Sequence, residues 1–203
     1  MYFGKIIGRV PPDRAGLAAE VLRTYDIAVR EGRSVDPSSM ALAAAALGTM
    51  ARMASPAESL SQRYGSRSKR ILGELRALRP EAAWPKILEG VWHYEVVRRG
   101  GAVGAALLQA SVERGDQLLK GSAEQMPTSP AAPFAHAVAM WSLDPVGLRV
   151  SARLQIDSAI KLSASGVDAS ALVEAIKIHA MTLKALDESG DLFALKQKAL
   201  AIM

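Results

Sequence analysis

The stretch SSMALAAAALGTMARMA, residues 38–54, is nearly all small and apolar, and it decides the fold class. Alanine, leucine and methionine are among the best helix formers because they lose little side-chain entropy in a helix. A helix that is apolar on most of its sides is usually buried by other elements. We therefore expect residues 38–54 to form a central helix of a helical protein.

The composition of the whole chain favours the same class. Its 203 residues include 36 Ala and 23 Leu, but only 4 Thr, 3 Phe and 4 Tyr. Strands favour β-branched and aromatic side chains, and these three types are scarce here. We therefore predict an all-α fold with no β-sheet of consequence.

Proline and glycine signals divide the chain into segments whose apolar residues recur every three or four positions, as on one helix face. Short turns between such segments make consecutive helices antiparallel. We predict about nine helices in stacked antiparallel hairpins, with a turn at Gly100–Gly101. The expected helices cover residues 13–31, 38–54, 57–78, 84–99, 102–125, 132–143, 146–162, 168–186 and a short segment after 191. Within 57–78, residues 64–66 are a candidate break.

The three histidines, His93, His136 and His179, are 43 residues apart, and a glycine follows each of them eleven residues later. A spacing of this size is typical of helical-hairpin repeats, which stack because one hairpin cannot bury its apolar face alone. We predict one helical domain over residues 1–203, with an irregular lead-in at 1–81 and a hairpin array at 82–203. Most other positions at this offset differ, so coincidence is the alternative.

Part of the chain shows a family pattern: aromatic and leucine residues in a first helix, small residues one turn apart in a second, and a proline before the next hairpin. The pattern is formed by Trp84, Leu88, Trp92 and Tyr94, by Ala152, Ile156 and Ala159, and by Pro127. In these residues the chain resembles the tetratricopeptide-like family over about residues 82–165. The resemblance implies a right-handed α–α superhelix whose concave face binds a peptide, a protein or, in some transport-associated members, a small ligand.

Several reactive chemistries lack the residues they need. The absence of cysteine excludes disulfides, thiolate nucleophiles and cysteine-ligated metals. Histidines at equivalent positions of stacked hairpins would lie about 8–10 Å apart, too far to share one ion at about 2 Å. No Gly-x-Ser-x-Gly motif occurs, and the glycine-rich residues 100–104 lack the ending of a phosphate-binding loop. We expect no catalytic residues, no metal, no cofactor and no enzymatic activity.

An aromatic cluster offers a candidate binding groove. Trp84, Trp92, His93 and Tyr94 lie within eleven positions, and their angular spread on a helix prevents all of them from sharing one face. Core packing is the alternative role, above all for Trp92. The groove hypothesis comprises Trp84, Trp92, His93, Tyr94, Phe134, His136 and Trp141.

A basic patch is the second candidate surface. Arg63, Arg67, Arg70 and Arg76 recur at helical spacing in a chain with a net charge of +5 and a pI near 9.6. Such a row could meet phosphates, whereas a solvated basic face is the commoner interpretation. Nucleic acid is therefore our weakest expectation for a partner.

These observations favour a non-enzymatic binding or scaffold protein that mediates protein–protein interaction. One alternative is a transport-associated accessory protein that binds a small apolar or anionic ligand. Another is a regulator that associates with nucleic acid. Homo-oligomerisation also stays open. No apolar run approaches 18 residues without a charge, so we expect no membrane span. Residues 1–9 are too short and broken for a signal peptide, which predicts a cytoplasmic protein, or a periplasmic one if a leader was removed.

Overall fold

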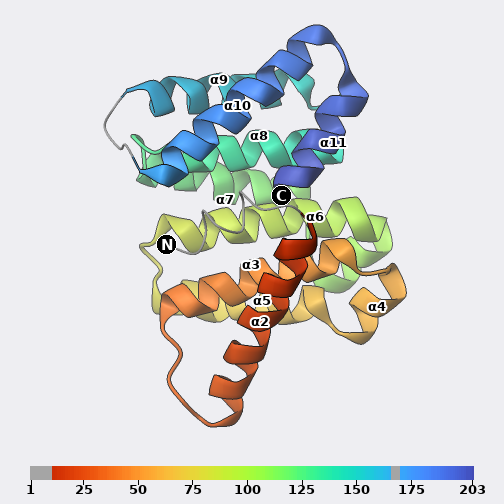
Figure 1. The fold of residues 1–203 in the computed structure, drawn as a ribbon, viewed down its shortest axis with the longest axis vertical. Helices are drawn as coiled ribbons and strands as arrows, with labels where there is room; N and C mark the ends of the chain where they lie inside the picture. The colour runs from red at the N-terminus through yellow and green to blue at the C-terminus, as the bar shows by residue number, and fades with distance from the viewer. Residues whose placement is uncertain (1–10, 166–169) are drawn as a thin grey trace.

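The computed structural model describes residues 11–165 and 170–203, and these contain ten α-helices and no strand (Figure 1). The prediction of an all-α hairpin fold with about nine helices is confirmed. The expectations for residues 1–9 and for a helix start at Asp168 lie outside the described residues. The helices are α2 (Pro11–Arg30), α3 (Pro37–Met53), α4 (Pro56–Ser61), α5 (Tyr64–Leu78), α6 (Ala83–Leu108), α7 (Val112–Gln125), α8 (Ala131–Leu143), α9 (Arg149–Ala164), α10 (Ala171–Ser189) and α11 (Leu192–Ile202).

Helix α3 is formed by the small, apolar stretch at residues 38–54, and it lies in the interior. The carboxylate of Asp36 caps its first turn by accepting hydrogen bonds from the amides of Ser38 and Ser39 at 2.9 and 3.1 Å. Ala43 and Leu47 are fully buried, and α3 packs against α2, α5 and α6. In Figure 1, α2 crosses α3 steeply instead of running beside it.

Two of the expected helices have different boundaries in the structure. The segment 57–78 divides into α4 and α5 at Arg63, whose φ of 54° is left-handed, one residue before the candidate break at 64–66. The predicted continuous helix over 102–125 was wrong. The expected break at Gly100–Gly101 is present as a kink, because the backbone of Gly101 is not helical (φ 55°, ψ −156°) and two helical segments of α6 meet there. The chain then reverses at Gln109, with a φ of 53°, and the hydroxyl of Ser111 caps α7 by accepting from the amide of Arg114.

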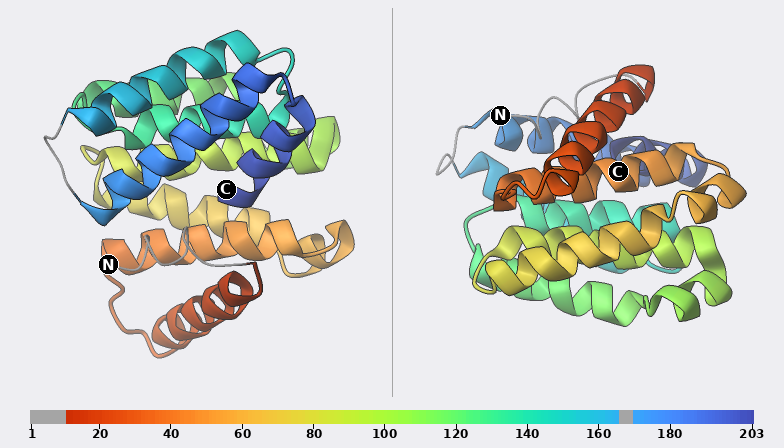
Figure 2. Two further views of the ribbon diagram at one scale, coloured as in Figure 1. Left: turned by 45° about the horizontal axis from the view of Figure 1, so that its top comes forward. Right: turned by 90° about the horizontal axis from the view of Figure 1, so that it is seen from below.

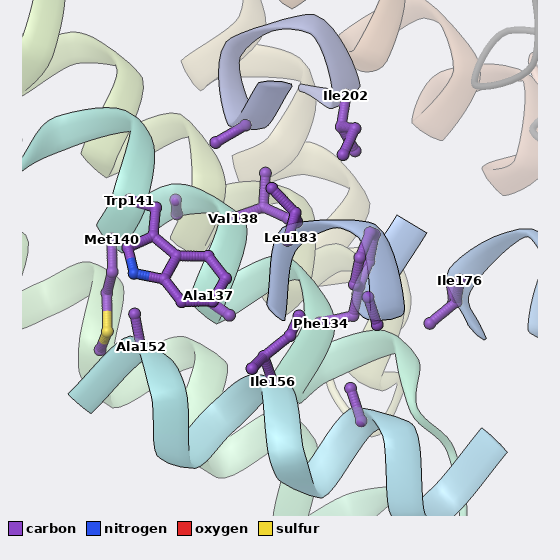
Figure 3. Packing of buried hydrophobic residues seen from close by; sticks show 14 of the residues in the cluster. Phe134, Ala137, Val138, Met140, Trp141, Ala152, Ile156, Ile176, Leu183 and Ile202 are labelled. Atoms are coloured by element: carbon purple, nitrogen blue, oxygen red, sulfur yellow. The ribbon is translucent and has the colours of Figure 1, made fainter. Parts of the chain in front are cut away.

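Two hydrophobic clusters share helix α6. The first is formed by α2, α3, α5 and the side of α6 that carries Trp92. The second is formed by the opposite side of α6, which carries Ile87 and Tyr94, together with helices α7 to α11. Figure 3 shows part of the second cluster, including Trp141. The predicted division of the chain into a lead-in and a hairpin array near residue 82 stays a prediction.

Helices α6, α8 and α10 each carry one of the three histidines and each precede a second helix of a pair. The pairs α6–α7 and α8–α9 pack along their lengths, while α11 turns back against α8 (Figure 2). Glycines bring α6 and α7 close together, because a Cβ on Gly90 would lie 2.6 Å from Leu119 Cγ and one on Gly115 would lie 2.9 Å from Tyr94 Cδ2. Side chains larger than hydrogen are therefore excluded at this crossing.

A buried carboxylate joins α9 to α10. Asp187, only 1% exposed, accepts from Nε of Arg149 at 2.6 Å and from Arg153 at 2.6 Å. Arg149 also donates to the main-chain carbonyl of Asp187 at 2.6 Å. Each carboxylate oxygen of Asp187 thus has a charged donor, which compensates for its removal from water.

Candidate functional site

An apolar cavity lies where the two hydrophobic clusters meet, and Ile202 and Met203 at the end of α11 contribute to its wall. Figure 1 shows the end of α11 near α6. The volume of the cavity is about 210 Å³. Helices α3, α5, α6, α8, α10 and α11 all contribute to its wall. The aromatic and polar residues of the wall are Thr49, Arg52, Ser68, Trp84, Trp92, Glu95, Phe134 and His179. Its apolar residues include Ala175 of α10.

Three of the seven residues of the predicted groove line this cavity: Trp84, Trp92 and Phe134. Trp84 and Trp92 come from the first half of α6, and Phe134 comes from α8. Trp84 remains 39% exposed, whereas Trp92 and Phe134 are buried. The structure therefore brings together aromatic side chains that are 50 residues apart in sequence, although core packing accounts for part of their burial.

The other four predicted groove residues lie away from the cavity. Nδ1 of His93 accepts a hydrogen bond from the amide of Ser111 at 3.1 Å, at the start of α7. Burial, together with the nearby cations Arg114, Lys69 and Arg76, lowers the pKa of His93 to about 4. Trp141 is completely buried in the second cluster. His93 and Trp141 therefore stabilise the fold.

Tyr94 and His136, the remaining two, meet at Asp116 of α7. The hydroxyl of Tyr94 donates to Oδ1 of Asp116, and Nε2 of His136 lies 2.7 Å from the same oxygen. Burial lowers the pKa of His136 despite the opposing effect of Asp116, so the ring is neutral and donates Nε2–H. Burial also raises the pKa of Tyr94 well above its usual range. This network ties α6, α7 and α8 together.

Most polar side chains in the cavity wall are already satisfied within the protein. The hydroxyls of Thr49 and Ser68 donate to the carbonyls of Ala45 and Ala44, and Nε1 of Trp92 donates to the carbonyl of Gly65 at 3.2 Å. The carboxylate of Glu95 accepts two hydrogen bonds from Arg98, at 3.1 and 2.9 Å. These groups hold the wall in place and have little capacity left for a ligand.

Arg52 and His179 are different. Arg52, in the last turn of α3, makes one side-chain hydrogen bond within the described chain, from Nη2 to the hydroxyl of Thr49 at 3.2 Å. Nδ1 of His179 is buried and has no hydrogen-bond partner among the described residues. Buried polar atoms are normally paired, so an orphaned atom on a cavity wall needs an explanation.

The predicted basic patch is largely neutralised by carboxylates. Arg67 contacts Asp26 at 2.7 and 2.9 Å, Arg76 contacts Glu89 at 3.0 Å, and Arg70 lies 3.8 Å from Glu74. Arg63 is exposed, and its backbone forms the left-handed turn before α5. These ion pairs reduce the charge that the row would present to a phosphate backbone.

Neither a metal-binding cluster nor a membrane-spanning helix is found in the described part of the chain. Across residues 11–165 and 170–203, no three or more His, Cys, Asp or Glu side chains are grouped so that they could hold a metal ion. Within the same ranges, no helix combines the length and the apolar character needed to cross a membrane.

Comparisons of the chain with family models, with curated proteins and with solved structures found no match. The resemblance to the tetratricopeptide-like family therefore stays a prediction. The geometry of the cavity is the remaining basis for assigning a function.

Sequence reasoning missed Arg52 as a site residue and noticed His179 only for its spacing. One signal for Arg52 was available, because it is the single charged residue in the apolar stretch 38–54. A lone cation near the C-terminal end of a helix more often has a structural role, because it interacts favourably with the helix dipole. Only the packing of the helices around α6 shows that Arg52 and His179 share a cavity.

Proposed function

We propose that this protein binds a small, mainly apolar molecule in the cavity between its two hydrophobic clusters. The observation that supports this is a volume of about 210 Å³ with a mostly apolar wall. An engineered apolar cavity of about 150 Å³ in another protein is large enough to bind benzene. A void of this size leaves wall atoms without contacts, and a ligand would restore them.

The geometry favours binding over catalysis. Ligand sites are typically concave and apolar, with few polar groups that fix the orientation of the ligand. The cavity wall fits this description, because its hydroxyls donate to carbonyls of the protein and its carboxylate is paired with Arg98. No hydroxyl of Thr49 or Ser68 has a histidine partner that would activate it as a nucleophile.

The test uses a neutral naphthylamine dye whose fluorescence rises in apolar surroundings. Trp84 and Trp92 line the cavity, so energy transfer from tryptophan to the dye would report binding there. Ala175→Leu places a larger side chain in the cavity and should weaken dye binding by about tenfold, on the order of 1.4 kcal/mol. Ala185→Leu is the control, because Ala185 is exposed on the same helix, outside the cavity. Equal dye binding by both variants would refute the proposal.

The protein-interaction role expected from the hairpin stack remains a second candidate. It is favoured by an exposed apolar row at the start of α9, formed by Val146 in the preceding turn and by Val150 and Leu154 of the helix, which are 68%, 75% and 66% exposed. Large apolar side chains grouped on a surface often mark interaction sites. Its test is the capture of a partner from a lysate of the source organism by the wild type and by Val150→Asp. Capture that is unchanged in the variant would count against this surface.

A further inference from the structure

Arg52 makes no ion pair with a carboxylate of the described chain. Among the described residues, no Asp or Glu oxygen lies within ion-pair distance of its guanidinium, whose only hydrogen bond is to Thr49. Its neighbours on α6 are occupied: Arg98 is paired with Glu95, and Arg99 donates to the carbonyls of Arg52 and Ala54 at 3.1 and 3.0 Å. Arg99 thereby satisfies the end of α3, so the guanidinium of Arg52 is not needed there.

We propose, building on the proposed function, that the ligand is an amphiphilic carboxylate whose head group binds Arg52 and whose alkyl chain fills the cavity. A guanidinium presents its donors as a planar fork that matches the two oxygens of a carboxylate. The mostly apolar wall, which includes Trp84 and Phe134, suits a hydrocarbon chain. Both parts of the ligand are thus specified by residues of the same cavity.

The charges around Arg52 also favour an anion. Burial lowers the pKa of Arg52 to about 10, and Arg14, Arg98 and Arg99 contribute to the decrease, while Glu95 opposes it. The group stays protonated at neutral pH. A poorly hydrated cation beside three other cations is stabilised when an anion binds to it.

His179 supplies a neutral polar group to the same ligand. Burial lowers its pKa, and the cations Lys198 and Arg14 lower it further, so the ring is uncharged at neutral pH. Arg52 and His179 both line the cavity, from α3 and α10 respectively. The unpartnered Nδ1 of His179 can therefore donate to, or accept from, the ligand that Arg52 holds.

The limited number of free polar groups points to a carboxylate and not to a phosphate ester. The planar fork of one guanidinium pairs with the two oxygens of a carboxylate and carries a single charge, whereas a phosphate ester presents three terminal oxygens and a charge of about −1.5 to −2. The other polar groups of the wall, on Thr49, Ser68 and Glu95, already have partners in the protein. A phosphate head group would leave oxygens unsatisfied in an apolar cavity, at a cost in affinity.

The inference is tested by displacing the neutral dye at pH 8 with octanoate, 1-octanol and octyl phosphate, which share one chain and differ in their head groups. Octanoate should displace the dye from the wild type at a concentration about 10- to 100-fold lower than octanol, as expected for charge-assisted hydrogen bonds. Arg52→Gln should remove this preference and leave octanol binding unchanged. Arg23→Gln is the control, because Arg23 is exposed on α2.

Each outcome has a defined meaning. Equal displacement by octanoate and octanol in the wild type would overturn the carboxylate inference while leaving the proposed function intact, and that comparison needs no variant to fold. Tighter binding of octyl phosphate would overturn the choice of head group. A preference for octanoate that survives Arg52→Gln, in a variant with an unchanged circular dichroism spectrum, would rule out the role of Arg52. Absence of dye binding to the wild type would refute the proposed function itself.

Discussion

Stability should fall as the pH drops below the usual pKa of histidine, and His93 should account for much of the loss. Its pKa falls from 6.5 in the unfolded chain to about 4 in the folded protein, because burial and nearby cations disfavour the charged ring. Between these two values the unfolded state binds more protons than the folded state. The contribution of His93 is therefore complete above pH 6.5 and is lost progressively as the pH falls towards 4. One pKa unit corresponds to about 1.4 kcal/mol, so the loss between pH 7 and pH 5 is about 2 kcal/mol.

The assay is urea unfolding followed by circular dichroism at pH 7 and pH 5, for the wild type and for His93→Asn. Asparagine can still accept from the amide of Ser111, as Nδ1 of His93 does at 3.1 Å, but it does not titrate. His136 and His179, whose pKa values burial also lowers, are present in both proteins and cancel in the comparison. The variant should lose about 2 kcal/mol less than the wild type. Equal losses would show that the burial of His93 does not control this pH dependence.

Two further substitutions test the backbone and the buried charges. Gly101→Ala should destabilise the protein by about 1–3 kcal/mol, because a φ of 55° with a ψ of −156° is a conformation that suits only glycine. Gly100→Ala, at an exposed helical position, should not destabilise the protein in the same urea titration, because alanine is the better helix former. Asp187→Ala should lower the free energy of unfolding by about 3 kcal/mol, which is at the low end of the range for breaking a buried ion pair. The loss is limited because the side chains of Arg149 and Arg153 are 34% and 46% exposed and can be hydrated again. A loss below about 1 kcal/mol in thermal or urea unfolding would mean that this carboxylate does not hold α9 to α10.

The fold class was predictable because it depends on local properties. Alanine and leucine content, spacing of apolar residues and turn signals act within a few residues of one another, and they identified most of the helices. The glycines at 100 and 101 correctly indicated a break in the helix, but the second break, at Gln109, was missed. Gly101 provides a kink there, and the reversal uses a left-handed glutamine, which no composition rule anticipates.

The candidate site was only partly predictable because it depends on contacts between distant segments. Aromatic content pointed to Trp84, Trp92 and Phe134, which do line the cavity. The same criterion also selected Tyr94 and Trp141, which lie elsewhere, since an aromatic residue in a helix does not reveal which neighbour it will face. Arg52 could not be identified as a ligand-binding candidate before the packing of α3 against α6 was known.

The shared position of α6 has a consequence for how the protein unfolds. Trp92 faces one hydrophobic cluster and Tyr94 faces the other, so neither cluster is complete without the same helix. If either half melted, an apolar side of α6 would be left in water. The two halves therefore behave as one cooperative unit, and the amide protons of α6 should be among the last in the chain to exchange with solvent.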